Sequence, residues 1–192
     1  MYKLIITFLI SVNLFSQEIL SEKNRAEVVN NILKDRLNNL LPDLMDQSEI
    51  DMWILISREY NEDPVLKTML PAEWLNARRR TIILFYRDKK NNTIDKLAVA
   101  RYNFGDNIIS AWDKETQPIQ WERLVELIKE RNPDKIGLNF SKDFNISDGL
   151  DKTDFDEFMQ VLPINYQDKI VSAETLSNLW IETRTEYEME LY

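Results

Sequence analysis

The sequence concentrates polar side chains in a few short stretches, and their types limit the chemistry that they could perform. The stretch SREYNEDP supplies Arg58, Glu59, Asn61 and Asp63 directly after DMWILIS, an apolar run of strand length. In open α/β sheets, ligands bind in loops at the carboxyl ends of strands. These residues are therefore candidates for a contact at a substrate entrance or an interface. The alternative is structural: Asn61 and Asp63 cap the next helix, and the charges form a surface ion pair.

Three other stretches carry polar or aromatic residues of interest. Trp112 stands in a polar segment, IISAWDKE, and could offer an exposed aromatic contact, the alternative being a packed side chain. The acidic stretch NISDGLDKTDFDE fails as a calcium loop, because placing Gly149 at the glycine position puts Phe144 and Ile146 at ligand positions. Its acids are expected to complement a helix dipole. The basic cluster 78–80 runs into the apolar stretch TIILFY and is predicted to be a solvated strand entrance.

The composition excludes several classes of catalytic site. The 192 residues include no histidine and no cysteine. A serine or cysteine nucleophile with a histidine base is therefore excluded, as are Cys/His zinc sites and iron–sulfur clusters. The formal net charge of −9 argues against a nucleic-acid partner, because phosphate backbones are bound by clustered Lys and Arg. We predict no catalytic residue, no metal site and no cofactor in this chain.

The N-terminus has the pattern of a secretory signal peptide. Lys3 is followed by LIITFLISVNL, an apolar run shorter than the ~20 residues of a transmembrane helix. We interpret residues 1–16 as a signal peptide with cleavage after Ser16. The alternative is a buried N-terminal strand or helix. The mature chain is expected to be secreted or periplasmic, with no membrane attachment after cleavage.

Hydrophobic periodicity predicts alternating helices and strands. A helix is expected over 22–45, with a break near Pro42. Its apolar stripe is formed by Val29, Leu33, Leu37, Leu40 and Leu44. Strands are predicted at 51–57, 79–88, 95–103, 135–140 and 168–174, and further helices after Asp63 and at 118–132, 151–162 and 175–182. The second and third strands form an antiparallel hairpin around Asn91-Asn92. This order predicts an α/β fold: one domain over 17–181, with a mixed sheet of about five strands flanked by helices.

The last eleven residues, ETRTEYEMELY, contain the start of a helix. Thr185 and Glu188 have the spacing of a capping box, in which each side chain accepts a backbone N–H of the first turn. Only seven residues follow Thr185, and so short a helix is marginal in water without support. A polar tail that matches the motif by chance is the alternative.

Two segments, IDMWILISREYNEDP and VSAETLSNLWIETRTEYEMELY, resemble the N-terminal domain of creatinase/prolidase-like metallopeptidases, in particular Xaa-Pro aminopeptidases. The resemblance covers about residues 36–192. Its most specific part is a helix with Trp180 followed by Glu182, Arg184, Thr185 and Glu188. It implies a non-catalytic α/β domain for oligomer contacts and for shaping the substrate entrance of a C-terminal catalytic domain. Residues 182–192 would begin the helix that leads to that domain, which this chain lacks.

The resemblance also implies the partners and cofactors. The partners would be the C-terminal catalytic domain of the same protein and further copies in a homodimer or higher oligomer. The catalytic domain would bind two divalent metals (Mn, Co or Zn) through two Asp, one His and two Glu. None of these ligands has a counterpart here, so this chain alone is expected to be inactive as a peptidase. The alternative is a free-standing exported binding module of the same fold, with the SREYNEDP loop as its contact.

Overall fold

The computed structural model describes residues 19–191 and has a mixed six-stranded sheet at its centre, ordered β4-β3-β2-β1-β5-β6. The signal peptide predicted at residues 1–16 lies outside the described residues. The strands are β1 (Met52–Arg58), β2 (Arg80–Asp88), β3 (Thr93–Ala98), β4 (Ile109–Ser110), β5 (Ile136–Leu138) and β6 (Ile170–Ser172). The prediction of about five strands missed β4, because two residues are too few to show an alternating pattern.

One strand, β2, sets the mixed character of the sheet. It pairs antiparallel with β1 and β3, whereas the pairs β3–β4, β1–β5 and β5–β6 are parallel. The predicted hairpin is confirmed in β2 and β3, and Asn92 in its turn has a left-handed φ of 53°. The third strand ends at Ala98, before its predicted end at 103, because the chain turns there into the loop that leads to β4.

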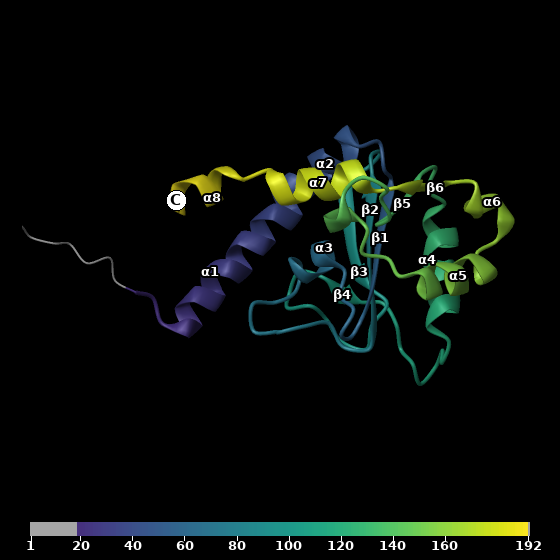
Figure 1. Ribbon diagram of the computed structural model, residues 1–192, viewed down its shortest axis with the longest axis horizontal. Coiled ribbons are helices and arrows are strands. Elements are labelled where there is room, and N and C mark those ends of the chain that lie inside the picture. The colour runs from purple at the N-terminus through teal and green to yellow at the C-terminus, as the bar shows by residue number, and fades with distance from the viewer. Residues whose placement is uncertain (1–18, 192) are drawn as a thin grey trace, which may run out of the picture.

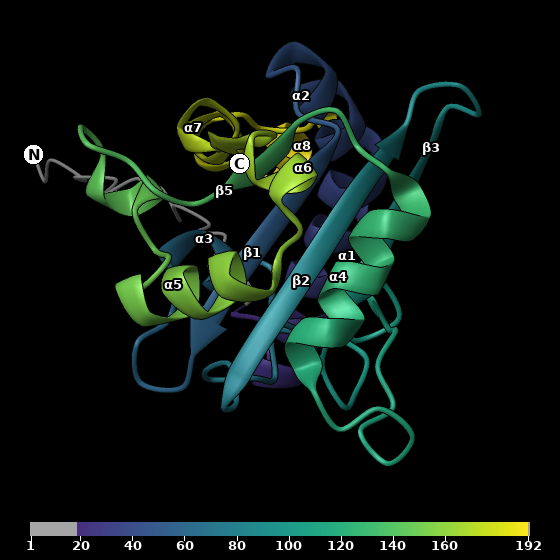
Figure 2. The same cartoon turned by 90° about the vertical axis from the view of Figure 1, so that its right-hand side faces the viewer.

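Helices cover both faces of the sheet (Figures 1 and 2). One face packs against α1 (Glu22–Asp35), α2 (Leu41–Gln47), α3 (Pro64–Lys67) and α7 (Glu174–Glu182), and the other against α4 (Gln120–Arg131), α5 (Lys152–Val161) and α6 (Ile164–Gln167). In β1, Trp53 and Leu55 face the first layer, while Met52, Ile54 and Ile56 face the second. A strand buried on both faces reads as a continuous apolar run, which is why DMWILIS was recognisable.

The long N-terminal helix is interrupted near Pro42, as predicted. A π-helical segment, Arg36–Leu40, separates α1 from α2, and the amide of Leu41 donates to the carbonyl of Arg36. Pro42 has no N–H with which to continue an ordinary α-helical ladder. The predicted apolar stripe is correct at Leu33, Leu37 and Leu44, which are buried. It is wrong at Val29, which is 48% exposed. Part of α1 extends beyond the sheet (Figure 1).

The C-terminal segment forms α8 (Glu186–Leu191), which lies beside α1, away from the sheet (Figure 1). Within residues 19–191, no helix has both the length and the apolar character that a membrane crossing requires.

Candidate functional site

The sheet brings the predicted polar candidates to one edge. The strands β1, β3 and β4 end at this edge, and β2 begins there because it runs in the opposite direction. Arg58 at the end of β1 is paired with Arg80 at the start of β2. The loops that follow β3 and β4 bring Tyr102 and Trp112 to the same hollow as Arg80. Separate stretches of sequence thus meet where open α/β sheets bind their ligands.

Arg58 is held in an ion pair with helix α5. Its Nη2 donates to Oδ1 of Asp154 at 2.7 Å and its Nε to Oδ2 at 2.9 Å. The hydrogen bonds to the buried Asp154 carboxylate raise the pKa of Arg58. Arg80 donates to Glu157 at 2.6 Å, and hydrogen bonds from Trp121 and Arg80 lower the pKa of Glu157. Both arginines therefore attach α5 to the sheet, which is a structural role.

Glu59 and Asn61 lie in a tight loop against the start of β2. The Glu59 amide donates to the Arg79 carbonyl at 2.7 Å, and the Arg79 amide donates to the Glu59 carboxylate at 3.1 Å. Asn61 forms a β-bridge with Arg58. Tyr60 and Arg79 have positive φ angles of 70° and 54°, a conformation that costs a non-glycine residue ~1 kcal/mol or more. The loop is exposed, but its backbone is fixed by these bonds.

Asp63 is fully buried and caps α3, as the structural alternative predicted. Its Oδ1 accepts from the amides of Val65 (2.7 Å) and Leu66 (2.9 Å), and its Oδ2 accepts from Asn139 Nδ2 (2.8 Å). Burial raises the pKa of Asp63, and these hydrogen bonds act in the opposite direction. A Cβ on Gly149 would lie 2.4 Å from this carboxyl group. The loop that contains Gly149 packs against Asp63 and therefore has no room for a side chain at that position. Asp63 is not available to a partner.

Trp112 lines a hollow of about 210 Å³ at the same edge. The side chain is half-buried, and its indole N–H donates to the carbonyl of Gln117 at 2.7 Å. The rest of the lining is mainly cationic and comprises Arg78, Arg79, Arg80, Ala100, Arg101, Tyr102, Lys114 and Gln120. Arg80 begins β2, as the sequence predicted for the basic cluster, whereas Arg78 and Arg79 precede the strand and are exposed.

Arg101 and Lys114 are members of this cluster that sequence reasoning missed. Neither belongs to a motif with recognisable spacing. Each follows a strand of the same sheet by a few residues, Arg101 after β3 and Lys114 after β4. This position was the available signal. It was hidden for Arg101 because the third strand was predicted to continue to 103, and for Lys114 because β4 was not predicted.

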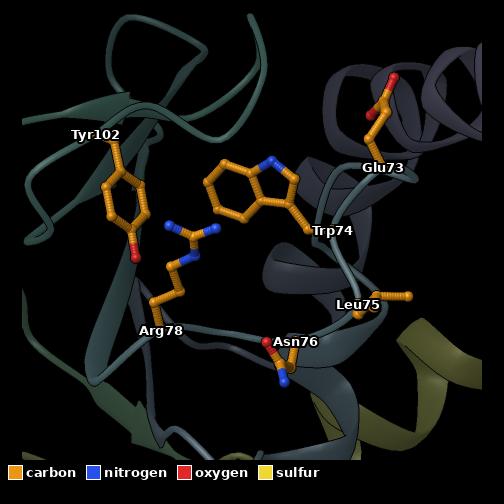
Figure 3. A pocket seen from close by; sticks show the side chains of 6 residues that line it. All are labelled: Glu73, Trp74, Leu75, Asn76, Arg78 and Tyr102. Atoms are coloured by element: carbon orange, nitrogen blue, oxygen red, sulfur yellow. The ribbon is translucent and has the colours of Figure 1, made fainter.

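A second hollow, of about 350 Å³, adjoins the first and shares Arg78 and Tyr102 with it. Figure 3 shows that the side chains of Arg78, Tyr102 and Trp74 point into the same space, with the Glu73 carboxylate pointing away. The two rings pack edge to face with centroids 5.2 Å apart. Both Glu73 oxygens accept from Asn30 Nδ2, at 3.0 and 3.1 Å.

The capping box in the C-terminal segment is confirmed. The Thr185 amide donates to Glu188 Oε2 at 2.9 Å, and the Glu188 amide donates to the Thr185 hydroxyl at 3.2 Å. Glu188 also accepts from Arg36 Nη1 at 2.7 Å, and the two side chains are only 10% and 9% exposed. The cap is thus joined to a buried ion pair.

Arg36 fixes this segment through further contacts. Its guanidinium donates to the carbonyls of Trp180 and Thr183, the latter at 2.8 Å, and lies 4.4 Å from the centroid of the Trp180 ring. An isolated helix as short as α8 would be marginal. Arg36 supplies the tertiary support that the length of α8 does not.

Metal-binding side chains do not cluster in the described part of the chain. Residues 19–191 contain no cluster of three or more His, Cys, Asp or Glu side chains that could hold a metal ion. The residues present therefore do not fit a two-metal hydrolytic centre, and no catalytic step is assigned to them.

Comparison with known proteins adds no evidence on the function of this chain. No protein-family model and no curated protein matches the sequence. Among solved structures, the chain is similar to an Xaa-Pro dipeptidase from Bacillus anthracis, with a TM-score of 0.44 and 12% sequence identity. The match covers 88% of this chain and 38% of the dipeptidase, so this chain spans well under half of that protein's length. A similarity of this size does not assign the chain to a family.

Proposed function

We propose that this chain is a non-catalytic domain of an exported Xaa-Pro aminopeptidase-like metallopeptidase. In this proposal it makes oligomer contacts and shapes the substrate entrance of a C-terminal catalytic domain. The sequence resemblance is strongest in VSAETLSNLWIETRTEYEMELY, which forms β6, α7 and α8. The observation that carries the proposal is the way in which α8 is held.

Helix α8 is held in place at its start, and it has exposed apolar side chains after the cap. The capping box and the Arg36–Glu188 pair define its direction as it leaves the sheet. Two apolar side chains beyond the cap, Met189 and Leu191, are 63% and 50% exposed. Apolar side chains on a firmly oriented, projecting helix suit packing against another domain. This is the geometry expected of a helix that leads into a catalytic domain.

Hydrolysis would belong to the C-terminal domain in this proposal. That domain would hold two divalent metals, Mn, Co or Zn, which supply a metal-bound hydroxide and polarise the scissile carbonyl. The contribution of this chain would be made by loop residues at the sheet edge, such as the half-buried Glu59 and the exposed Asn61, rather than by the buried Asp63.

The coding DNA that follows the Tyr192 codon tests the proposal directly. It should encode, in frame, roughly 200 or more further residues, the size of another domain. These should contain Asp, Asp, His, Glu and Glu in that order along the chain. An in-frame stop directly after Tyr192, with no such domain encoded nearby, would overturn the proposal.

A kinetic experiment with purified proteins provides a second test. The joined protein should cleave Xaa-Pro peptides only when a divalent metal is added, and residues 17–192 alone should not cleave them with or without metal. Calorimetric titration of residues 17–192 with Mn, Co or Zn should show no binding tighter than roughly micromolar. A stoichiometric nanomolar site would contradict the assignment of the metals to another domain.

A free-standing exported binding module is the second candidate function. It is favoured by the cationic and aromatic hollow beside Trp112, which is a site that a purely accessory domain does not need. A stop codon after Tyr192 would support this candidate over the first.

A further inference from the structure

Cations without an anionic partner gather around the two adjoining hollows. They are Arg78, Arg79, Arg101 and Lys114. Within residues 19–191, none of these side chains forms an ion pair or donates a hydrogen bond. The neighbouring Arg80 differs, because its guanidinium is bonded to Gln120 and Glu157. In a chain of net charge −9, this edge is a local region of positive potential that can attract an anion.

Aromatic rings form the walls of the same hollows. Because the indole N–H of Trp112 is already bonded to Gln117, what Trp112 offers a ligand is its flat apolar surface. The Arg78 guanidinium points into the hollow that Tyr102 and Trp74 also line (Figure 3). Because the exposed Arg78 side chain donates no hydrogen bond within residues 19–191, its donors are free. They match the two oxygens of a carboxylate or phosphate.

We propose that this edge binds a small organic anion that carries a carboxylate or phosphate group on a flat ring. Arg78 holds the oxyanion, with Arg101 and Lys114 contributing charge, and the ring of the ligand packs against Trp112. The hollows, of about 350 and 210 Å³, together reach the size of small-molecule sites. Their position at the carboxyl edge of the sheet is also where such sites occur.

The surroundings favour a small anion over a polyanion. Arg80, which lines the hollow, is bonded to Glu157 in α5, and this helix also carries Asp154 and Asp156. The carboxylates of α5 would repel a nucleic acid that extended past the hollow. The site is independent of the proposed peptidase relationship, because it uses only residues of the described chain.

Calorimetry with simple probes tests the proposal on the intact chain. Phenyl phosphate or benzoate should bind with a Kd below about 1 mM, and the difference between them shows which oxyanion is preferred. Inorganic phosphate should bind at least about tenfold more weakly than phenyl phosphate, because it lacks the ring. Benzyl alcohol, which lacks the charge, should show no saturation. The indole ¹⁵N–¹H signals of Trp112 and Trp74 should shift with the better probe.

Substitutions then locate the site. Arg78→Gln should weaken binding of the better probe by at least about tenfold, and Arg101→Gln should weaken it less. Arg25→Gln provides the matched control, because Arg25 is exposed on α1 and forms no ion pair in the described chain. Thermal unfolding confirms that each variant is folded, and Lys114→Gln replaces any that is not. The proposal is overturned if neither ring-bearing probe saturates, or if the substitutions at 78, 101 and 114 leave its affinity unchanged.

Discussion

Two arginines on this molecule, Arg36 and Arg78, have opposite environments. Arg36 lies over the ring of Trp180, and its donors are taken up by Glu188 and two main-chain carbonyls. Arg78 lines a hollow together with Trp74, is exposed, and donates no hydrogen bond within residues 19–191. The same residue type therefore anchors the structure in one place and lines a hollow with free donors in the other.

The difference lies in hydrogen-bond satisfaction. A buried guanidinium must have its donors paired, because an unpaired buried charge is costly. Once its donors are paired within the protein, the guanidinium has no free N–H group that could bind a ligand. An exposed guanidinium is paired by water, which a ligand oxyanion can displace. Residues with satisfied donors stabilise the fold, and residues with free donors around a hollow are the better candidates for function.

Removing the Arg36 side chain should give the largest effect. We expect Arg36→Ala to lower the free energy of unfolding by about 3 kcal/mol, because Glu188 and two carbonyls lose their buried partner. Urea denaturation measures this loss, and hydrogen exchange should show faster opening of α8. Arg25→Ala, on the exposed surface of α1, is the control and should change stability by less than ~0.5 kcal/mol. Equal losses in the two variants would contradict the anchoring role.

A double-mutant cycle isolates the contribution of the pair itself. Arg36→Ala and Glu188→Ala, made singly and together, should show a coupling energy of about 1–3 kcal/mol, since the two side chains are in direct contact. Denaturant unfolding of the four proteins gives the value. Simple additivity would mean that Arg36 acts through Trp180 and the carbonyls alone.

Loss of the cap should have a smaller and more local effect. We expect Thr185→Ala to destabilise α8 by ~1 kcal/mol, because the Glu188 amide loses its acceptor. Hydrogen exchange at that amide should speed up while the sheet amides stay unchanged. Thr183→Ala is matched in residue type, and its hydroxyl makes no hydrogen bond in the described chain. If both variants opened α8 equally, the capping box would not be the cause.

Substitution of Arg78 should have the smallest effect on stability. Arg78→Ala is expected to change the free energy of unfolding by less than ~0.5 kcal/mol, as for an exposed residue with no protein partner. The same urea experiment as for Arg36→Ala measures it. A loss as large as that of Arg36→Ala would show that Arg78 is structural, and the contrast between the two arginines would disappear.

Local signals made a large part of the fold predictable. DMWILIS is a continuous apolar run because β1 is buried on both faces, and α4 could be identified from Trp121, Leu124, Leu127 and Ile128, all of them buried. Asp63 followed by Pro64 predicted the start of α3, and the Thr185–Glu188 spacing predicted the start of α8. Each of these features depends on residues within one or two turns, or on one strand, so sequence spacing is sufficient.

The candidate site was much less predictable. Two residues proposed from the SREYNEDP stretch are already engaged in the structure. Arg58 is paired with Asp154, and Asp63 caps α3 and accepts from Asn139. Asp154 and Asn139 lie far from the stretch in the sequence. Trp112 was identified as an aromatic candidate, but its cationic neighbours come from other loops. Only the strand order, with β2 reversed between β1 and β3, brings these loops to one edge.

The amino-acid types alone exclude histidine- and cysteine-based catalysis, because a side chain that is absent cannot act. They also place the helices and most strands, whose patterns arise from neighbours in the chain. Whether a given arginine stabilises the fold or can bind a ligand depends instead on which groups accept its hydrogen bonds. Arg36 is paired with Glu188, which lies 152 positions later in the sequence. Such a pairing exists only once burial has brought distant segments together.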